Sequence, residues 1–370
     1  SAPAAASPAA YRTALENFDR VKGNVLRSLE GHCRAVSGLA DALAIQFESG
    51  LGSPVLAKRA AAGCIRRCHG DLHLSNIVLW QGKPVPFDAL EFDENLATID
   101  TMYDLAFLLM DLDRRGARDM ANAVLNRYLW RSRELIDIEG LALLPLFLGL
   151  RAAIRAMVTF DRIATDSAHA DTLRQDAMAI VYDALLYLQS RTGQVEPRLI
   201  AVGGLSGTGK TTLARKLAPS MGPVPGALHL RSDMERKALA GVEPLERLPP
   251  SAYTQASSNA VYERIFERAR HALDAGHSVI LDAVFAHEDE RTQAENVARS
   301  ANAAFTGFWL EGAQSTLAAR VSARTGDASD ATADVVTRQF TYDIGEIRWH
   351  RLDAGGDADE LSDRAKILLQ

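Results

Sequence analysis

The chain has 370 residues, of which 47% are hydrophobic and 24% charged, and its formal net charge is −6. This length exceeds what one ordinary hydrophobic core needs, so we expect a soluble globular protein with two domains. The mild acidic excess argues against a surface that coats nucleic acid. Three cysteines are an odd and low number, which favours a reducing cytosol over a disulfide framework.

Neither the start of the chain nor its most apolar stretch indicates a targeting segment. Residues 1–10 contain no basic segment followed by an apolar one, so we do not interpret them as a signal peptide. The most apolar stretch, Leu141–Phe160, is interrupted by Pro145, Arg151 and Arg155. We therefore predict a buried amphipathic helix there rather than a membrane span.

The first half of the chain has mainly helical periodicity. It covers residues 11–68, with a break near Gly50–Pro54, and returns over Ile99–Gln189. Between them lie two short strand-like runs joined by a turn at Gln81–Lys83. These runs are Ile77–Trp80 and Val85–Phe87. We expect a mainly α domain over residues 1–194.

The pattern changes after Thr192–Pro197, a short segment with Gly and Pro that is typical of a domain boundary. Strand-like and helical runs then alternate to the end, which predicts an α/β domain over residues 198–370, with a parallel sheet covered by helices on both faces. The expected strands are Arg198–Gly203, Ala227–Arg231, Ser278–Asp282, Phe305–Leu310 and a weaker one near Trp349–Leu352.

A phosphate-binding motif follows the first of these strands. Gly204–Thr211 fits the pattern G-x-x-x-x-G-K-[ST], after an apolar run and at the start of a helix. In this context backbone N–H groups cradle phosphates, Lys210 reaches the β- and γ-phosphates, and the Thr211 hydroxyl holds Mg²⁺. An ordinary glycine-rich turn is the alternative. The candidate ATP-binding residues are Gly204, Ser206, Gly207, Thr208, Gly209, Lys210, Thr211 and Thr212.

Two acidic residues follow the next two strands, where ligands of open α/β sheets bind. Asp233 is a candidate base for an acceptor hydroxyl, and Arg236, one turn later, is a candidate to bind the acceptor. A helix cap with an exposed arginine is the alternative for this pair. Asp282 is a candidate magnesium ligand, with a strand-end cap as its alternative.

Arg320 and Arg324 are four residues apart in a helical stretch before a polar loop at Thr325–Asp330, and a helix with Arg338 follows. Two arginines on one helix face before such a loop indicate a lid that places positive charge on the transferring phosphoryl group. The alternative is a solvated basic face.

Residues 198 to about 355 resemble the small P-loop kinases related to zeta toxins, adenylylsulfate kinase and the polynucleotide 5′-kinase domain. The resemblance rests on the P-loop, on Asp233-x-x-Arg236 and on Arg320-x-x-x-Arg324 with the segment Ser329–Ala331. It implies that Asp233 is the catalytic base and that the two arginines act from a lid. The acceptor differs among these families and does not transfer.

A second constellation lies in His69–Asn76, followed by Phe87-Asp88. Aspartates and asparagines at this spacing can orient an acceptor hydroxyl and hold Mg²⁺. The segment resembles the catalytic loop of aminoglycoside phosphotransferases and other protein-kinase-like enzymes. The resemblance implies that Asp71 is the catalytic base, that Asn76 and Asp88 bind the metal, with Glu91 as an alternative, and that Asp104 buttresses the loop.

Only the C-lobe of that fold is matched, because 68 residues precede His69 and they have helical periodicity. Neither Lys22 nor Lys58 lies in the β-strand frame that the N-terminal lobe requires. The order of the two modules resembles a bacterial family of two-domain proteins, described as aminoglycoside phosphotransferase family or ATP-binding proteins.

The sequence therefore predicts a magnesium- and ATP-dependent phosphotransferase that works from the C-terminal domain on a hydroxyl of a small metabolite, sugar or nucleotide. Its partners would be ATP and that acceptor. Two alternatives are a polynucleotide 5′-kinase, which needs a basic channel, and a regulator that binds ATP without transferring phosphate.

Overall fold

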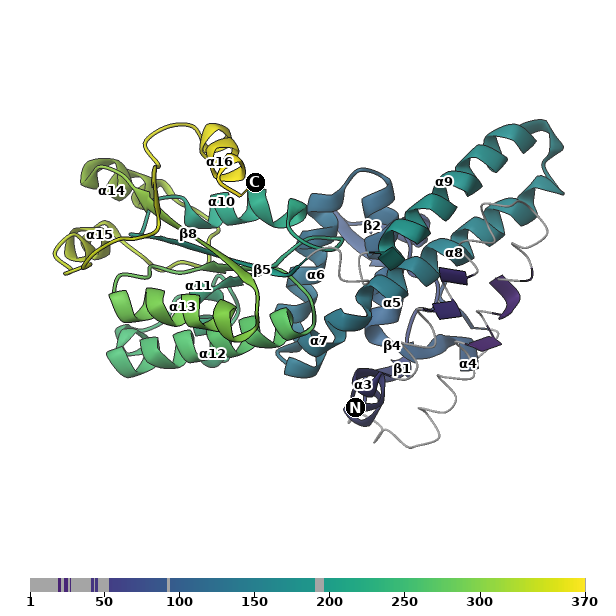
Figure 1. Cartoon of the computed structure of the whole chain (residues 1–370), viewed down its shortest axis with the longest axis horizontal. Coiled ribbons are helices and arrows are strands. Elements are labelled where there is room, and N and C mark those ends of the chain that lie inside the picture. The colour runs from purple at the N-terminus through teal and green to yellow at the C-terminus, as the bar shows by residue number, and fades with distance from the viewer. Residues whose placement is uncertain are drawn as a thin grey trace. The chain divides into compact units, whose positions relative to one another are not determined.

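A computed structural model describes residues 19–20, 23–25, 27, 41–42, 44–45, 53–91, 94–189 and 196–369 (Figure 1). The chain forms two compact units. The first unit contains the described residues up to 189 together with 223–225, and the second contains 196–222 and 226–369. The predicted boundary segment lies mostly outside the described residues, so the domain limits 1–194 and 198–370 stay predictions.

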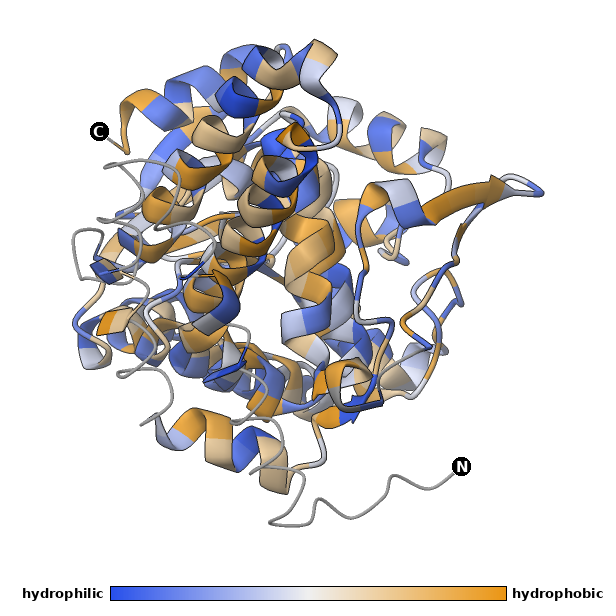
Figure 2. Ribbon diagram, turned by 90° about the vertical axis from the view of Figure 1, so that its right-hand side faces the viewer, coloured by the Kyte–Doolittle hydropathy of each residue, from blue (hydrophilic) through white to orange (hydrophobic). Residues whose placement is uncertain are grey.

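The first unit is mainly helical. The core helix α8 packs along α9 and against α5, and Figure 2 shows hydrophobic and hydrophilic residues alternating along helices of this unit, as in amphipathic helices. Helix α5 begins at Thr101 because the Asp100 carboxylate accepts a hydrogen bond from the Met102 amide. The helices are α3 (Pro54–Ala61), α4 (Glu94–Ala97), α5 (Thr101–Arg114), α6 (Arg118–Ser132), α7 (Leu135–Glu139), α8 (Leu144–Ile163) and α9 (Ala170–Gln189).

Two small antiparallel sheets lie in this unit. Strands β2 (Ile77–Trp80) and β3 (Lys83–Pro86) form the predicted hairpin, turning at Gln81 and Gly82, whose φ angles are 50° and 72°. Strands β1 (Ile65–Arg67) and β4 (Thr98–Asp100) pair with each other, although the sequence predicted helical structure in both places. That prediction was wrong because this pairing joins residues distant in the chain and leaves no local periodicity.

The apolar stretch of the first unit lies in α7, α8 and the short helix between them. Residues Leu135–Ile163 are long and apolar enough to cross a membrane by length and composition, but 72% of their most apolar window is buried inside the protein. Arg151 in α8 is itself buried and donates to the carbonyl oxygens of Tyr103 and Gly70. This environment agrees with the predicted buried helix.

The second unit is built on a sheet of five parallel strands in the order β6-β7-β5-β8-β9. Each expected strand is present, and no end is shifted by more than one residue. The strands are β5 (Arg198–Gly204), β6 (Leu228–Arg231), β7 (Val279–Asp282), β8 (Ala304–Glu311) and β9 (His350–Asp353). The central strand β5 therefore delivers the P-loop to the middle of the carboxyl edge of the sheet.

Helices cover both faces of this sheet, which confirms the predicted fold class. Helices α10 and α16 lie on one face, and α12 and α13 lie on the other (Figure 1). The first face buries Ile200, Val202 and Phe308 against Leu213 and Leu217 of α10. The helices are α10 (Lys210–Leu217), α11 (Ser232–Leu239), α12 (Gln255–Asp274), α13 (Glu288–Ser300), α14 (Gln314–Ala323), α15 (Ala333–Gln339) and α16 (Ala358–Ile367).

Candidate nucleotide-binding and phosphoryl-transfer site

The P-loop connects β5 to α10 and needs its glycines. Gly204, Gly207 and Gly209 have backbone φ angles of 137°, 88° and 87°, which residues other than glycine rarely adopt. A Cβ atom on Gly207 would lie 2.6 Å from the carbonyl oxygen of Leu317, whereas the space at Gly209 is open. The loop thus packs tightly against α14 on one side and leaves room at the start of α10.

This opening is suited to an anion. The first amides of α10 have no intrahelical acceptors, and the helix dipole adds partial positive charge there. Lys210, the first residue of α10, donates from Nζ to the carbonyl oxygens of Gly204 (2.7 Å) and Leu205 (3.0 Å). Burial lowers the pKa of Lys210. A half-buried ammonium that donates its hydrogen bonds to neutral carbonyls is a natural partner for phosphate oxygens, so the residues fit a bound nucleotide.

Asp282 at the end of β7 faces the same place. Its Oδ2 atom accepts hydrogen bonds from the Thr211 hydroxyl (2.6 Å) and from His229 Nε2 (3.2 Å). Burial acts to raise the pKa of Asp282, but His229, Arg231 and Lys210 together hold it well below its usual range. The side chain is thus an ionised carboxylate bonded to α10, which differs from a simple strand-end cap.

Sequence reasoning missed His229 and Arg231. They lie two residues apart on β6, so their side chains project from the same face of the sheet, and Arg231 is in register with Asp282 on β7. Both side chains are about nine-tenths buried. The signal in the sequence was a pair of polar residues alternating within a strand that otherwise reads as buried.

Asp233 and Arg236 lie on α11, directly after β6. Asp233 is inside the first turn, and no side chain caps this helix, so the cap alternative does not apply. The negative charge of Asp233 acts on Lys210, opposing the larger effect of burial on the pKa of that lysine. Arg236 donates to the carbonyl oxygen of Ala252 (2.9 Å) and lies over the ring of Tyr253, 5.0 Å from its centroid.

The two arginines predicted for a lid do not share a helix face. Helix α14 ends at Ala323, and Arg324 continues in an extended conformation with ψ of 134°. Arg320 donates to the carbonyl oxygen of Ala354 (2.7 Å), while Arg324 lies 3.7 Å from Asp327 and its charge acts on Lys210. The expectation of one shared face was wrong because the helix stops one residue too early.

The segment 324–332, which we call the lid loop, joins α14 to α15 and is fixed at two points. Asp330 Oδ2 accepts hydrogen bonds from Lys237 Nζ (2.6 Å), the Tyr253 hydroxyl (2.6 Å) and the Leu248 amide (3.1 Å). Asp327 Oδ1 accepts one from Arg231 Nη2 (3.2 Å). The lid loop is therefore bound to the strand and helix that carry Arg231 and Asp233.

The second constellation is also an ordered loop, in the first unit. Asn76 Nδ2 donates to Asp71 Oδ2 (3.0 Å), and His73 Nε2 lies 3.3 Å from the same oxygen. The hydrogen bond from His73 is the main cause of a lowered pKa of Asp71. Asp88 is exposed with φ of 60°, and no hydrogen bond or ion pair joins it to the described residues. Glu91 is exposed as well.

Buried residues hold this loop in place. Asp104 accepts hydrogen bonds from the amides of His69 (3.1 Å) and Gly70 (2.9 Å), and Asp111 accepts one from Leu74 (2.9 Å). Asp104 thus buttresses the loop as the resemblance implied. Lys58 lies on α3 and pairs with Glu139, and Lys22 lies outside the described residues.

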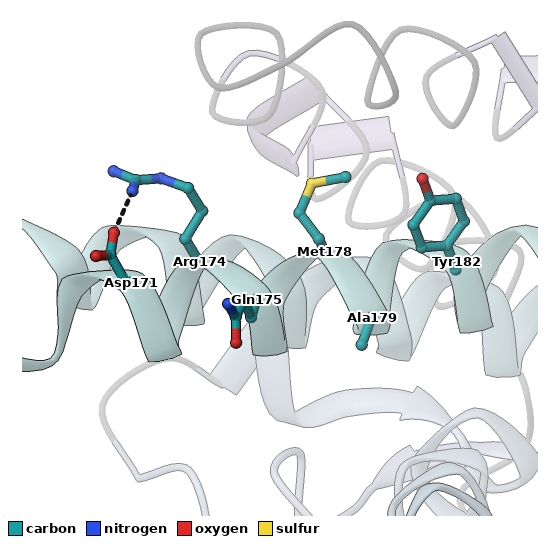
Figure 3. Close-up of a pocket in the computed structure, with 6 residues that line it drawn as sticks. All are labelled: Asp171, Arg174, Gln175, Met178, Ala179 and Tyr182. Carbon is teal, nitrogen blue, oxygen red and sulfur yellow. Dashed lines mark hydrogen bonds and ion pairs between the residues drawn. The ribbon is translucent and has the colours of Figure 1, made fainter.

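A surface pocket of about 570 Å³ lies along α9 and contains none of the predicted site residues (Figure 3). Its lining consists of Asp171, Arg174, Gln175, Met178, Ala179 and Tyr182, all from one helix. Within the described residues, no group of three or more His, Cys, Asp or Glu side chains could hold a metal ion.

Comparison with known proteins identifies the second unit. Residues 199–342 match the family described as an AAA domain. Together with the five-stranded parallel sheet and the loop Gly204–Thr211, this match makes the second unit a P-loop domain.

Mycobacterial proteins described as uncharacterized match most of the chain. The chain is 33% identical over 344 residues to uncharacterized proteins of Mycobacterium tuberculosis and Mycobacterium bovis, which covers 91% of this chain. It spans 63% of the length of these relatives.

Several solved structures are similar to part of the chain. A gluconokinase from Sinorhizobium meliloti is 21% identical with a TM-score of 0.34, covering 46% of this chain and 91% of its own. A sugar kinase from Janibacter is 22% identical with a TM-score of 0.36, covering 47% and 94%. The APS kinase of Mycobacterium tuberculosis is 18% identical with a TM-score of 0.31, covering 47% and 98%.

Proposed function

We propose that the second unit is an ATP-dependent phosphotransferase that acts on a hydroxyl group of a small metabolite, sugar or nucleotide. One observation carries the proposal: Lys210, the Thr211–Asp282 pair and Asp233 all lie at or after the ends of strands at the carboxyl edge of the parallel sheet, and the charge of Asp233 acts on Lys210. A P-loop alone predicts only phosphate binding. The carboxylate of Asp233, which does not cap α11, adds a group that is able to take up a proton.

In the proposed reaction, an acceptor oxygen forms a bond to the γ-phosphorus while the bond from that phosphorus to the β–γ bridging oxygen breaks, which leaves ADP. Asp233 accepts the proton of the acceptor hydroxyl. Lys210 and the amides of α10 hold the phosphates in line and balance their charge. Bound Mg²⁺ would add charge neutralisation, and Thr211 and Asp282 are the residues that would hold it, in keeping with a cation that takes most of its ligands from phosphates and water.

Arg324 and Arg236 complete the proposed site. Arg324 is the better placed of the two lid arginines, since its charge reaches Lys210, whereas Arg320 is bound to Ala354. Arg236 follows Asp233 by about one turn of α11 and lies over the ring of Tyr253, and both side chains would contact the acceptor. We propose a reducing cytosol as the location, in line with the free thiols of Cys64 and Cys68.

The test is transfer of label from γ-labelled ATP to a panel of sugars, nucleosides, small alcohols and an oligonucleotide with a free 5′ end. Asp233→Asn should lower kcat by about 10²–10⁴ without weakening ATP binding, because it removes the base and a negative charge that acts on Lys210. Asp363→Asn on α16 is the matched control and should transfer at the normal rate. Lys210→Ala should abolish ATP binding, and Lys216→Ala on the same helix should not.

Each outcome has a definite meaning. If only the oligonucleotide is labelled, the acceptor is the 5′ end of a polynucleotide and not a small molecule. Tight ATP binding with no transfer to any acceptor would favour the regulatory alternative. ATP binding that survives Lys210→Ala would place the nucleotide elsewhere in the chain and contradict the proposal.

A further inference from the structure

Arg231 is a buried cation whose guanidinium is only partly satisfied. It is the last residue of β6, and its side chain is about nine-tenths buried. Nη2 donates to Asp327, but Nε makes no hydrogen bond within the described part of the chain and lies 3.6 Å from Asp282 Oδ2. A buried donor without an acceptor is costly, which makes this guanidinium ready for an additional acceptor.

The position of Arg231 is at the nucleotide site. Its neighbour Asp282 is hydrogen-bonded to Thr211 of α10, and its own positive charge acts on Lys210. Two residues further along the chain is Asp233, the proposed base. Arg231 therefore lies beside a carboxylate that is bonded to the helix after the P-loop, and two residues before the proposed base.

The carboxylate of Asp327 has two cationic neighbours at this place. Asp327 Oδ1 accepts a hydrogen bond from Arg231 Nη2 (3.2 Å) and lies 3.7 Å from Arg324 Nη1. The arginines come from β6 and from the end of α14, and the carboxylate comes from the lid loop. A carboxylate between two guanidinium groups uses the same charge and hydrogen bonds that a phosphate oxygen would use.

We propose that Arg231 is a phosphate-binding residue of the nucleotide site, and that Asp327 occupies its guanidinium until the γ-phosphate takes its place. This inference rests on the proposed function. The exchange needs only a local shift, because Asp330 independently attaches the lid loop to Lys237, Tyr253 and the Leu248 amide. Arg231 and Arg324 would then bind the phosphoryl group that is transferred, while the freed Asp327 turns to solvent.

The experiment compares the affinities of a non-hydrolysable ATP analogue and of ADP, each with Mg²⁺, for the full chain by calorimetry. Arg231→Met should weaken the ATP analogue by about 10- to 100-fold, as expected for loss of a charge-assisted hydrogen bond, and change ADP affinity far less. Arg231→Lys keeps the positive charge and should retain part of the preference for the ATP analogue over ADP. Thermal unfolding without nucleotide checks that each variant folds.

Asp327→Asn gives an independent test that leaves Arg231 in place. It removes the competing charge, so the affinity for the ATP analogue should rise severalfold over that of the natural protein, while ADP affinity changes little. Asp330→Asn is the matched control, because it loosens the same loop without touching Arg231 and should leave the ratio of the two affinities unchanged.

Three results would overturn the inference. The first is a folded Arg231→Met protein that keeps the natural ratio of affinities. The second is an Asp327→Asn protein with no gain for the ATP analogue, and the third is an equal gain in Asp330→Asn, which would assign the effect to loop mobility. If the natural protein binds neither nucleotide, the proposed function fails together with this inference; if it binds both, only the role of Arg231 is at stake.

Discussion

At the scale of single residues, the site centres on Asp282. A carboxylate with 5% of its side chain exposed is stable as an anion only when hydrogen bonds and cations replace water. Thr211, His229 and Arg231 provide these from α10 and β6. The negative charge is therefore available to the site before any metal ion binds.

His277 allows a pH-dependent prediction. It is 2% exposed, donates from Nε2 to the carbonyl oxygen of Gly226 (2.9 Å), and burial lowers its pKa to about 4 from 6.5. As the pH falls, the histidine therefore binds a proton in the unfolded chain at a higher pH than in the folded one. The stability that depends on neutral His277 is complete above pH 6.5 and is lost as the pH falls toward 4. Between pH 7 and pH 5 the loss should be about 2 kcal/mol.

Urea denaturation at pH 7 and pH 5 measures this difference, and His277→Gln keeps a donor for Gly226 without the titration. The free energy of unfolding of the variant should fall by about 2 kcal/mol less between these pH values than that of the natural protein. An identical fall in both proteins would show that burial of His277 does not cause the loss of stability at acid pH.

At the scale of elements, the ends of helices and strands were harder to predict than their presence. The strand over Ile77–Trp80 matched because its pattern and turn are local, whereas β1 and β4 were missed because each is defined only by the other. The end of α14 at Ala323 was equally hidden. The nearest glycine, Gly326, lies three residues beyond that end, and the end determines where Arg324 points.

One buried ion pair should hold several elements of the first unit together. Arg59 of α3 donates to both carboxylate oxygens of Asp100 (2.7 and 2.8 Å) and to Asp137 of α7 (2.9 Å). Asp100→Ala removes the main partner of this buried guanidinium and also the N-terminal cap of α5. The free energy of unfolding should therefore fall by about 3–5 kcal/mol.

Chemical denaturation monitored for the first unit tests this prediction. Asp171→Ala is the matched control, since Asp171 forms an exposed pair with Arg174 on α9 and should leave stability nearly unchanged. Equal stability of the two variants would mean that the Arg59–Asp100 pair contributes nothing beyond an ordinary surface pair.

At the scale of the whole molecule, two ordered loops carry catalytic-type residues, one in each unit. Of these two loops, as far as the structure describes the chain, the one in the second unit adjoins a half-buried lysine at a helix start. The loop around Asp71 has Asn76 and His73 beside it. We therefore assign the proposed nucleotide site to the second unit.

Hydrogen exchange with and without an ATP analogue and Mg²⁺ examines this assignment across the chain. Slower exchange should be confined to the second unit, with the largest effect in the P-loop and the lid loop, because bound phosphates give their amides acceptors. Protection of residues 69–76 with no change at 204–212 would transfer the nucleotide site to the first unit.

The sequence by itself determined the P-loop, the α/β character of the second half and the helical character of the first, because each depends on neighbours within one or two turns of chain. Only the tertiary structure decided that Asp282 accepts a hydrogen bond from Thr211 and that Arg231 lies between Asp282 and Asp327. It also decided that Arg320 and Arg324 contact different segments of the chain. These contacts depend on the strand order β6-β7-β5-β8-β9. That order brings together segments distant in the chain, and no local pattern records it.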